Sequence, residues 1–234
     1  NGTCLDEKWA EFLKENNFLV GISLDGTGFI HDRFRVDGQG EGSFVRVMEG
    51  IGLLKKYGVD FNILTVVHAM TAKKTTQIYD FYKQNGFTYL QFIPCLNPIA
   101  REQERFAYTL TPKAYGHFLK TLFDLWYNDL KSGVIVHIQQ FEEYVKMFLL
   151  MPANVCGMNG VCSCQHVVEA DGEVYPCDFY VLDGYRLGSL NEVSFDRINE
   201  KRKEIRFIEE SARMHEDCRH CKYAPICRGG CRRH

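Results

Sequence analysis

The chain has 234 residues, of which 45% are hydrophobic and 25% are charged, and its formal net charge is −2 at pH 7. These values indicate a globular protein with an apolar core, made of one ordinary domain or of one and a half smaller ones. The small net charge excludes a strong general attraction to nucleic acid or to an anionic membrane, and the longest apolar runs are too short to span a bilayer.

The first predicted elements are a helix, a strand and a turn. Apolar residues at helical spacing predict a helix over 6–17, and a β-rich apolar run predicts a strand over 18–24 that ends at the turn-forming pair Asp25-Gly26. The same alternation continues along the first two thirds of the chain. We predict further strands at 59–67 and 89–95, and further helices at 43–58, 75–86, 111–133 and 139–150.

Capping residues mark the ends of two of these helices. Ser43 is the expected N-cap of the first, because a serine hydroxyl accepts a hydrogen bond from a free backbone N–H there, and Gly58 is its expected C-cap. Thr111 and Pro112 occupy the cap and first-turn positions of the longest predicted helix. These residues fix the predicted helix boundaries.

Near-continuous apolar strands between amphipathic helices predict an α/β fold in which helices cover a parallel sheet. A βα barrel contains about eight strands and an open doubly wound sheet about five or six, but only three strands are predicted here. We therefore expect residues 1–150 to form the second half of a larger βα sheet whose first half is absent from the chain. The lack of a targeting signal is then uninformative.

The last third of the chain has a different pattern. Residues 165–180 predict a β-hairpin with a type I′ turn at Asp171-Gly172, and its second strand leads directly to Cys177 and Asp178. Residues 194–218 predict one charged amphipathic helix. Its charges are expected to face solvent rather than to form a binding site.

Ten cysteines are concentrated near the C-terminal end, with eight of them after residue 155. An oxidised, secreted chain would usually be small and would carry cysteines throughout. A cysteine-poor body followed by a cysteine-dense tail instead favours a reduced, cytoplasmic protein whose tail binds metal. The eight thiols form two groups, Cys156-x5-Cys162-x-Cys164-x12-Cys177 and Cys218-x2-Cys221-x5-Cys227-x3-Cys231.

The spacing leaves the type of metal open. A Cys-x2-Cys pair places two thiolates around one tight turn, from which both can reach one metal. Zinc in a four-thiolate site fits such pairs, and iron–sulfur clusters also take four thiolates with more varied spacing. The irregular gaps in both groups favour iron–sulfur, and zinc stays open as the alternative.

Five stretches of the sequence carry a family resemblance: SLDG…HDRFR, FNILTVV, YLQFIPC, CGMNGVCSCQHVVEADGEVYPCDFYVLDGYRLGSL and CRHCKYAPICRGGCRR. Together they resemble the anaerobic sulfatase-maturating enzymes, which are radical SAM proteins with a cysteine-rich C-terminal SPASM domain. The resemblance covers nearly the whole chain. It implies the C-terminal half of a partial (β/α)6 radical SAM barrel over 1–150, followed by a SPASM-type iron–sulfur domain over 151–234.

The resemblance also implies two auxiliary 4Fe–4S clusters. One would be held by Cys156, Cys162, Cys177 and Cys231. The other would be held by Cys218, Cys221, Cys227 and a fourth cysteine further downstream, which this sequence does not contain. The Cys-x3-Cys-x2-Cys motif that holds the SAM-cleaving 4Fe–4S cluster in the family is missing as well. We therefore expect the chain to be truncated at both ends and inactive alone.

For the intact protein, the resemblance implies an oxidoreductase that uses S-adenosyl-L-methionine (SAM). Reductive cleavage of SAM would yield a 5′-deoxyadenosyl radical that removes a Cβ hydrogen from a cysteine or serine of a sulfatase. Loss of a proton and a second electron, followed by hydrolysis in the case of cysteine, would give Cα-formylglycine under anaerobic conditions. The implied partners are the sulfatase polypeptide and an electron donor such as flavodoxin or ferredoxin.

The resemblance assigns roles to single residues as well. Asp178 matches the family's general base, whereas its simplest local role is to cap a turn. Ser23 and Asp25 follow the strand end at which barrel active sites gather, and with the loop residue Leu96 they match positions that hold SAM; a plain turn and ordinary packing are the alternatives. Arg35 would bind a carboxylate of SAM or substrate bidentately, or else lie on the surface.

Two other functions stay open. One is a different SPASM radical enzyme, which modifies ribosomal peptides by cross-linking, and the other is a non-catalytic zinc-binding module that docks a partner protein. The histidines, including His31 and His68, show no metal-site spacing and are expected to be structural.

Overall fold

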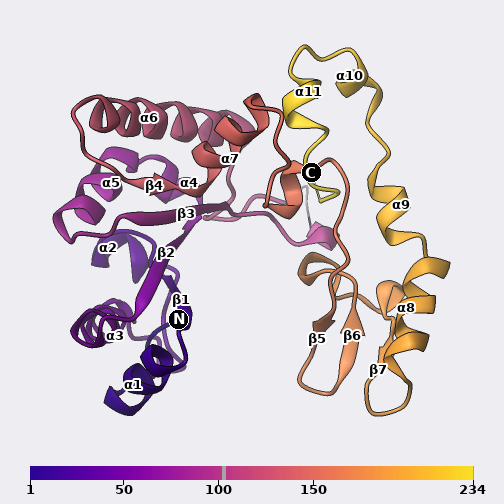
Figure 1. The fold of residues 1–234 in the computed structure, drawn as a ribbon, viewed down its shortest axis with the longest axis horizontal. Coiled ribbons are helices and arrows are strands. Elements are labelled where there is room, and N and C mark those ends of the chain that lie inside the picture. The colour runs from indigo at the N-terminus through magenta and orange to yellow at the C-terminus, as the bar shows by residue number, and fades with distance from the viewer. Residues whose placement is uncertain (102–103, 234) are drawn as a thin grey trace. The chain divides into compact units, whose positions relative to one another are not determined.

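The computed structural model describes residues 1–101 and 104–233, and the chain divides into two compact units, Asn1–Glu142 and Glu143–His234. The first unit is built around a parallel sheet and the second around a small antiparallel sheet with short helices (Figure 1). The division falls inside one helix, α7 (Gln139–Phe148), ahead of the boundary expected at residue 150.

Four parallel strands pair in chain order in the first unit: β1 (Leu19–Ser23), β2 (Asp60–Val67), β3 (Tyr89–Pro94) and β4 (His137–Ile138). The three predicted strands are confirmed. The sequence does not reveal β4, because two residues carry no alternation that a pattern can show. Ser23 lies opposite Leu64, and Leu64 opposite Gln91, so the carboxyl ends of the strands meet at one edge of the sheet.

Helices pack against one face of this sheet. Along β2, the alternate residues Ile63, Thr65 and Val67 are fully buried, whereas the residues between them are partly exposed. This one-sided burial differs from the two covered faces expected from the apolar strands, because the second face of the sheet is only partly covered. The helices of the unit are α1 (Glu7–Glu15), α2 (Gly28–His31), α3 (Phe44–Tyr57), α4 (Ala69–Ala72), α5 (Thr75–Gln84), η1 (Ile99–Arg101) and α6 (Pro112–Lys131).

The three predicted cap positions are confirmed, but one of them lacks the expected side-chain hydrogen bond. Thr111 accepts a hydrogen bond from the N–H of Ala114 at the start of α6, and Gly58 ends α3 in the left-handed conformation at φ 65°. Ser43 is the N-cap residue of α3, as predicted, but its side chain makes no cap hydrogen bond. Asp32 Oδ1 accepts from the Phe44 N–H at 2.8 Å, because the Ser43 hydroxyl donates instead to the Arg35 carbonyl.

The second unit contains a three-stranded antiparallel sheet in the order β5 (Val167–Val168), β6 (Glu173–Tyr175) and β7 (Gly188–Ser189). Val174, Leu187 and Ile198 form a small buried core. The helical segments are η2 (Cys156–Met158), η3 (Asp178–Tyr180), η4 (Asp183–Tyr185), α8 (Phe195–Glu204), α9 (Phe207–Ser211), α10 (Glu216–Arg219) and α11 (Ala224–Cys227). Across the described parts of both units, no helix is long and apolar enough to cross a membrane.

Two local predictions for this unit need correction. The hairpin is confirmed, but its turn is not type I′: the Gly172 N–H donates to the Glu169 carbonyl, and only Gly172 of the turn has a positive φ, at 86°. This is a three-residue loop with a glycine bulge. The single helix predicted over 194–218 is also wrong, because the chain breaks at Arg206 (φ 50°, ψ 38°), where it turns so that Phe207 becomes buried.

Candidate functional site

A polar network lies at the carboxyl edge of the parallel sheet, around Asp25. Asp25 follows β1, and the whole residue is 2% exposed. Its Oδ2 accepts from Arg35 Nε at 2.5 Å, and its Oδ1 accepts from Arg35 Nη2 at 3.3 Å and from the Val66 N–H at 2.8 Å. The buried carboxylate is therefore compensated by a bidentate arginine and by a backbone donor of the neighbouring strand.

The turn that carries Asp25 needs a glycine at its next position. Gly26 has a φ of +95°, and a Cβ atom there would lie 2.7 Å from Cγ1 of Ile78 on α5. Both the conformation and the close approach exclude a side chain at this residue. The predicted turn is thus confirmed, and the reason for the glycine is packing as well as conformation.

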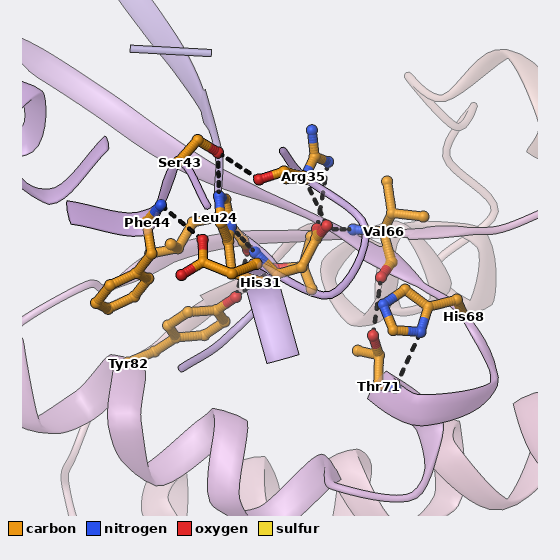
Figure 2. A network of polar contacts seen from close by, with 12 residues as sticks. Leu24, His31, Arg35, Ser43, Phe44, Val66, His68, Thr71 and Tyr82 are labelled. Carbon is orange, nitrogen blue, oxygen red and sulfur yellow. Dashed lines mark hydrogen bonds and ion pairs between the residues drawn. The ribbon is translucent and has the colours of Figure 1, made fainter. Parts of the chain in front are cut away.

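Two histidines support this network in different ways (Figure 2). His31 Nδ1 accepts from the Asp25 N–H at 3.2 Å, so Nε2 carries the hydrogen and donates to Ser43 Oγ at 3.0 Å. His68 Nδ1 accepts from the N–H groups of Met70 and Thr71. Burial lowers the pKa of both imidazoles, which keeps them neutral in the fold.

Two buried side-chain atoms at this edge lack a hydrogen-bond partner among residues 1–101 and 104–233, namely Thr27 Oγ1 and His68 Nε2. Because Nδ1 of His68 accepts two backbone hydrogen bonds, its Nε2 carries a hydrogen that no protein group receives. Buried donors in native proteins nearly always have a partner. The edge therefore fits a polar ligand, and these two unpartnered atoms are not signalled by the sequence pattern.

The four predicted cofactor-binding residues gather at this same edge. Ser23 ends β1, Leu96 lies just beyond β3, and both side chains are half-buried. Two of the nitrogens of Arg35 are bound by Asp25, and its side chain remains 27% exposed. A separate cavity of about 550 Å³ lies at the opposite, amino ends of the strands, where Leu19, Asp60 and Tyr89 line it, away from these residues.

In the second unit, the fold brings together thiols from three parts of the sequence: Cys156 and Cys162, Cys177, and Cys231. Cys231 lies within electrostatic range of Cys156 and Cys162, and Cys177 lies within range of Cys231. A Cβ atom on Gly157 would lie 3.3 Å from Cβ of Cys231, so the chain segments approach closely. All ten cysteines, each among the described residues, are free thiols.

Burial governs the acidity of these thiols. It raises the pKa of Cys177 to about 12, and the thiol also donates to Asp178 Oδ1 at 3.3 Å. Burial likewise raises the pKa of Cys231, against the lowering effect of the Arg233 N–H that donates to its sulfur. Metal ligation would have to displace these protons.

Four thiols from separate segments that converge in one place fit the ligand set of an iron–sulfur cluster. Within the described ranges, no three Cys, His, Asp or Glu side chains stand close enough to hold one metal ion. A cluster of several iron atoms spans a larger space than one ion does.

Asp178 lies at the start of η3, directly after Cys177. It is exposed, and its Oδ1 accepts from the Phe179 N–H at 3.1 Å as well as from the Cys177 thiol. The bond from Phe179 is local and is not the predicted cap, because Cys177 is the N-cap residue of η3 and no side chain caps that turn. An exposed carboxylate has further acceptor positions for a substrate proton, so the geometry allows the role of a base.

The remaining cysteines occupy different surroundings. Cys218 and Cys221 flank one turn, in which the Cys221 N–H donates to the Cys218 carbonyl, and Cys227 ends α11. Cys164 is exposed and is in contact with the Arg202 guanidinium. This placement agrees with its exclusion from the predicted ligands.

Comparison with known proteins gives these features a context. The SPASM family, described as an iron–sulfur cluster-binding domain, matches residues 156–222. A cysteine-type anaerobic sulfatase-maturating enzyme of Clostridium novyi is 48% identical over 233 residues, which are 100% of this chain and 62% of the relative. The serine-type enzyme of Bacteroides thetaiotaomicron is 31% identical, over 99% of this chain and 59% of its own length.

The chain is a homologue of the anaerobic sulfatase-maturating enzymes. Its fold is that of the corresponding part of native anSMEcpe, solved with bound AdoMet and Cp18Cys peptide, with a TM-score of 0.94 over 100% of this chain and 64% of that one. The α/β fold class predicted from the sequence is thus confirmed. Streptococcus suis SuiB shares the fold alone, at 11% identity and a TM-score of 0.57.

Proposed function

We propose that the protein carrying this chain is a radical SAM oxidoreductase that converts a residue of a sulfatase to Cα-formylglycine under anaerobic conditions. The observation that carries the proposal is the convergence of Cys156, Cys162, Cys177 and Cys231 beside the exposed Asp178. The 48% identity to cysteine-type maturases, against 31% to a serine-type one, favours a cysteine as the target.

SAM and the 4Fe–4S cluster that cleaves it would supply the radical that removes the substrate hydrogen. The carboxyl edge of the parallel sheet would bind SAM, with Ser23 and Leu96 in contact with it. Asp25 is buried and accepts three hydrogen bonds, two of them from Arg35, so it would act through Arg35 by holding the guanidinium in one orientation. The unpartnered Nε2 of His68 supports a polar ligand at this edge.

Asp178 would accept the proton that the substrate loses. Its Oδ1 is already fixed by the Phe179 N–H, so the carboxylate is held by the backbone and needs no other group to orient it. Because the side chain is exposed, a substrate thiol can reach it. A positioned carboxylate base of this kind accelerates proton transfer by about 10²–10⁴-fold.

The two cysteine groups would hold auxiliary 4Fe–4S clusters, which accept the second electron. The first would use Cys156, Cys162, Cys177 and Cys231, and the second would use Cys218, Cys221 and Cys227. Flavodoxin or ferredoxin would deliver electrons. Ten free thiols and this oxygen-sensitive chemistry suit the reducing cytoplasm.

The direct test is an anaerobic assay of the complete protein with SAM, dithionite and a sulfatase-derived peptide that contains a target cysteine. The proposal expects formylglycine in the peptide, detected by mass spectrometry and by hydrazide labelling of the aldehyde. A serine-containing peptide measures the target preference. Cleavage of SAM that leaves the peptide unmodified, or that introduces a cross-link, would contradict the proposal.

A further inference from the structure

Cys231 is the one proposed ligand of the first cluster that comes from a distant part of the sequence. The other three thiols of its group lie on the hairpin and on the segment before it, whereas Cys231 arrives from the far end of the chain, beyond α11. Closing so long a loop costs conformational entropy. A ligand delivered in this way needs contacts that fix it in place.

The next residue supplies such contacts. The Arg232 guanidinium lies 4.6 Å from the ring centre of Phe207, 5.4 Å from that of Tyr180 and 5.8 Å from that of Tyr185. All three distances fall within the range of cation–π attraction. We call Arg232 and these three rings the Arg232 cage.

The walls of the cage are themselves fixed. The three rings meet edge to face, with centres 4.9 Å apart for Tyr180 and Tyr185 and 5.2 Å apart for Tyr180 and Phe207. Phe207 is 1% exposed, and it reaches this position through the left-handed turn at Arg206. The left-handed turn at Arg206 therefore places the Phe207 ring in the cage.

Two hydrogen bonds also hold Arg232 in place. Arg232 Nη1 donates to the Phe207 carbonyl at 2.8 Å, and the Tyr180 hydroxyl donates to the Arg232 carbonyl at 3.4 Å. Arg232 is thus held at both its side chain and its backbone. Cys231 is covalently attached to a residue that has little freedom to move.

The cage also connects two ligand segments. Tyr180 ends the short helix that starts at Asp178, and its N–H donates to the Cys177 carbonyl at 2.9 Å. The Arg232 guanidinium and the Cys231 thiol both lie within electrostatic range of the Tyr180 hydroxyl. One side of the cage therefore belongs to the Cys177 turn and the other to the Cys231 segment.

We propose that the Arg232 cage positions Cys231 as a ligand of the first auxiliary cluster, and that its enclosed positive charge raises the reduction potential of that cluster. Arg232 is a positioning residue that acts through Cys231 and does not touch the substrate. A fixed cation favours the reduced cluster, which carries one more negative charge. This inference rests on the ligand set given under the proposed function. Its test distinguishes failure of the cage from failure of that function.

The test uses the chain reconstituted anaerobically with iron and sulfide, in four variants and the parent. Arg232→Met keeps the length and removes the charge, Arg232→Lys keeps the charge, and Cys231→Ser gives the iron content of a chain without this ligand. Arg213→Met is the matched control, because Arg213 is exposed and pairs only at the surface, with Glu210.

Arg232→Met is expected to lower iron and sulfide toward the Cys231→Ser level, and any cluster that still assembles is expected to have a more negative midpoint potential. Arg232→Lys should recover most of the potential, and Arg213→Met should match the parent. A parent chain without iron and sulfide would contradict the proposed function. If the parent assembles a cluster and Arg232→Met equals it in iron content and potential, the proposed role of the Arg232 cage is wrong. The proposed function would still stand.

A second measurement covers variants that assemble poorly. In the metal-free chain, the rate of Cys231 alkylation relative to that of Cys156 reports how firmly the segment is held. The cage predicts a faster relative rate in Arg232→Met and in Tyr185→Leu, and no change in Arg213→Met. Equal relative rates in all of these chains would overturn the proposal.

Discussion

Asp25 and Arg35 form a bidentate ion pair at the carboxyl edge of the parallel sheet, with Arg35 Nε 2.5 Å from Oδ2 and Arg35 Nη2 3.3 Å from Oδ1. The carboxylate side chain is 3% exposed and the guanidinium 27%. A charge this deeply buried depends on its partner, since leaving it alone in the core is costly.

Arg35→Met is therefore expected to destabilise the first unit by about 3 kcal/mol, because it leaves the Asp25 carboxylate without its counter-charge. The matched control is Arg46→Met, which breaks the more exposed pair with Asp37 and should cost about 1 kcal/mol or less. Both tryptophans, Trp9 and Trp126, belong to this unit, so their fluorescence during urea unfolding reports its stability. Equal losses in the two variants would contradict this account.

The stability of the first unit is expected to fall as the pH drops below about 6.5. Burial lowers the folded-state pKa of His31 and His68 from the ordinary value of 6.5, so the unfolded chain binds protons in a range where the folded chain does not. The contribution of these histidines to the free energy of unfolding is thus greatest above pH 6.5. It declines as the pH falls from 6.5 toward the lowered pKa values. Urea titrations from pH 8 to pH 5 measure this slope, and His31→Gln should reduce it. A flat profile in the parent chain would be inconsistent with neutral buried histidines.

Cysteine replacements should separate the ligands of the first cluster from the spare thiol beside them. Cys156→Ser and Cys177→Ser are expected to abolish that cluster, since each removes one of four thiolates. Cys164→Ser should leave it intact, because Cys164 is exposed and contacts Arg202. Iron and sulfide analysis after anaerobic reconstitution provides the readout. Loss of the cluster in Cys164→Ser would show that the ligand set is different.

Gly160→Ala is expected to loosen the loop that carries Cys156 and Cys162. Gly160 has a φ of +72°, and a Cβ atom there would overlap the carbonyl oxygen of Arg228, so both strain and a clash oppose the substitution. We expect a loss of about 2 kcal/mol or more. Gly184→Ala is the control, because it meets no atom within 4 Å. Amide hydrogen exchange should accelerate around residues 156–162 in the first variant only, and equal exchange in both would argue against a tightly packed loop.

Asp178→Asn tests the proposed base in the complete protein. The amide oxygen can still accept from the Phe179 N–H, so the turn should persist while the ability to take a proton is lost. Formylglycine production is expected to fall by about 10²–10⁴-fold, with iron content and SAM cleavage unchanged. Asp183→Asn, at the start of η4, is the control and should keep full activity. Normal turnover in Asp178→Asn would remove this residue from the mechanism.

The strands and most of the helices of the first unit follow from the sequence, because their apolar periods extend over many residues. Elements set by tertiary contacts do not. β4 is too short to show a period, and the helix expected over 194–218 breaks at Arg206 so that Phe207 can be buried. The side-chain hydrogen bond at the start of α3 comes from Asp32, twelve positions before the residue it binds, which local pattern cannot reveal.

The candidate site residues remain predictions from spacing and from the family resemblance. Spacing marks the cysteines as metal ligands, and the family resemblance selects which of them act together. The support around them depends on the fold. The Arg232 cage unites residues 180, 185, 207 and 232, and His68 has a buried Nε2 without a partner in the described part of the chain. Neither feature has a sequence pattern of its own.

The most direct test of the central claim is the iron, acid-labile sulfide and zinc content of this chain after anaerobic purification and reconstitution. The convergence of Cys156, Cys162, Cys177 and Cys231 predicts at least about four iron and four sulfide per chain, with brown absorption that dithionite bleaches. A colourless chain that holds zinc and no sulfide after reconstitution would contradict the claim.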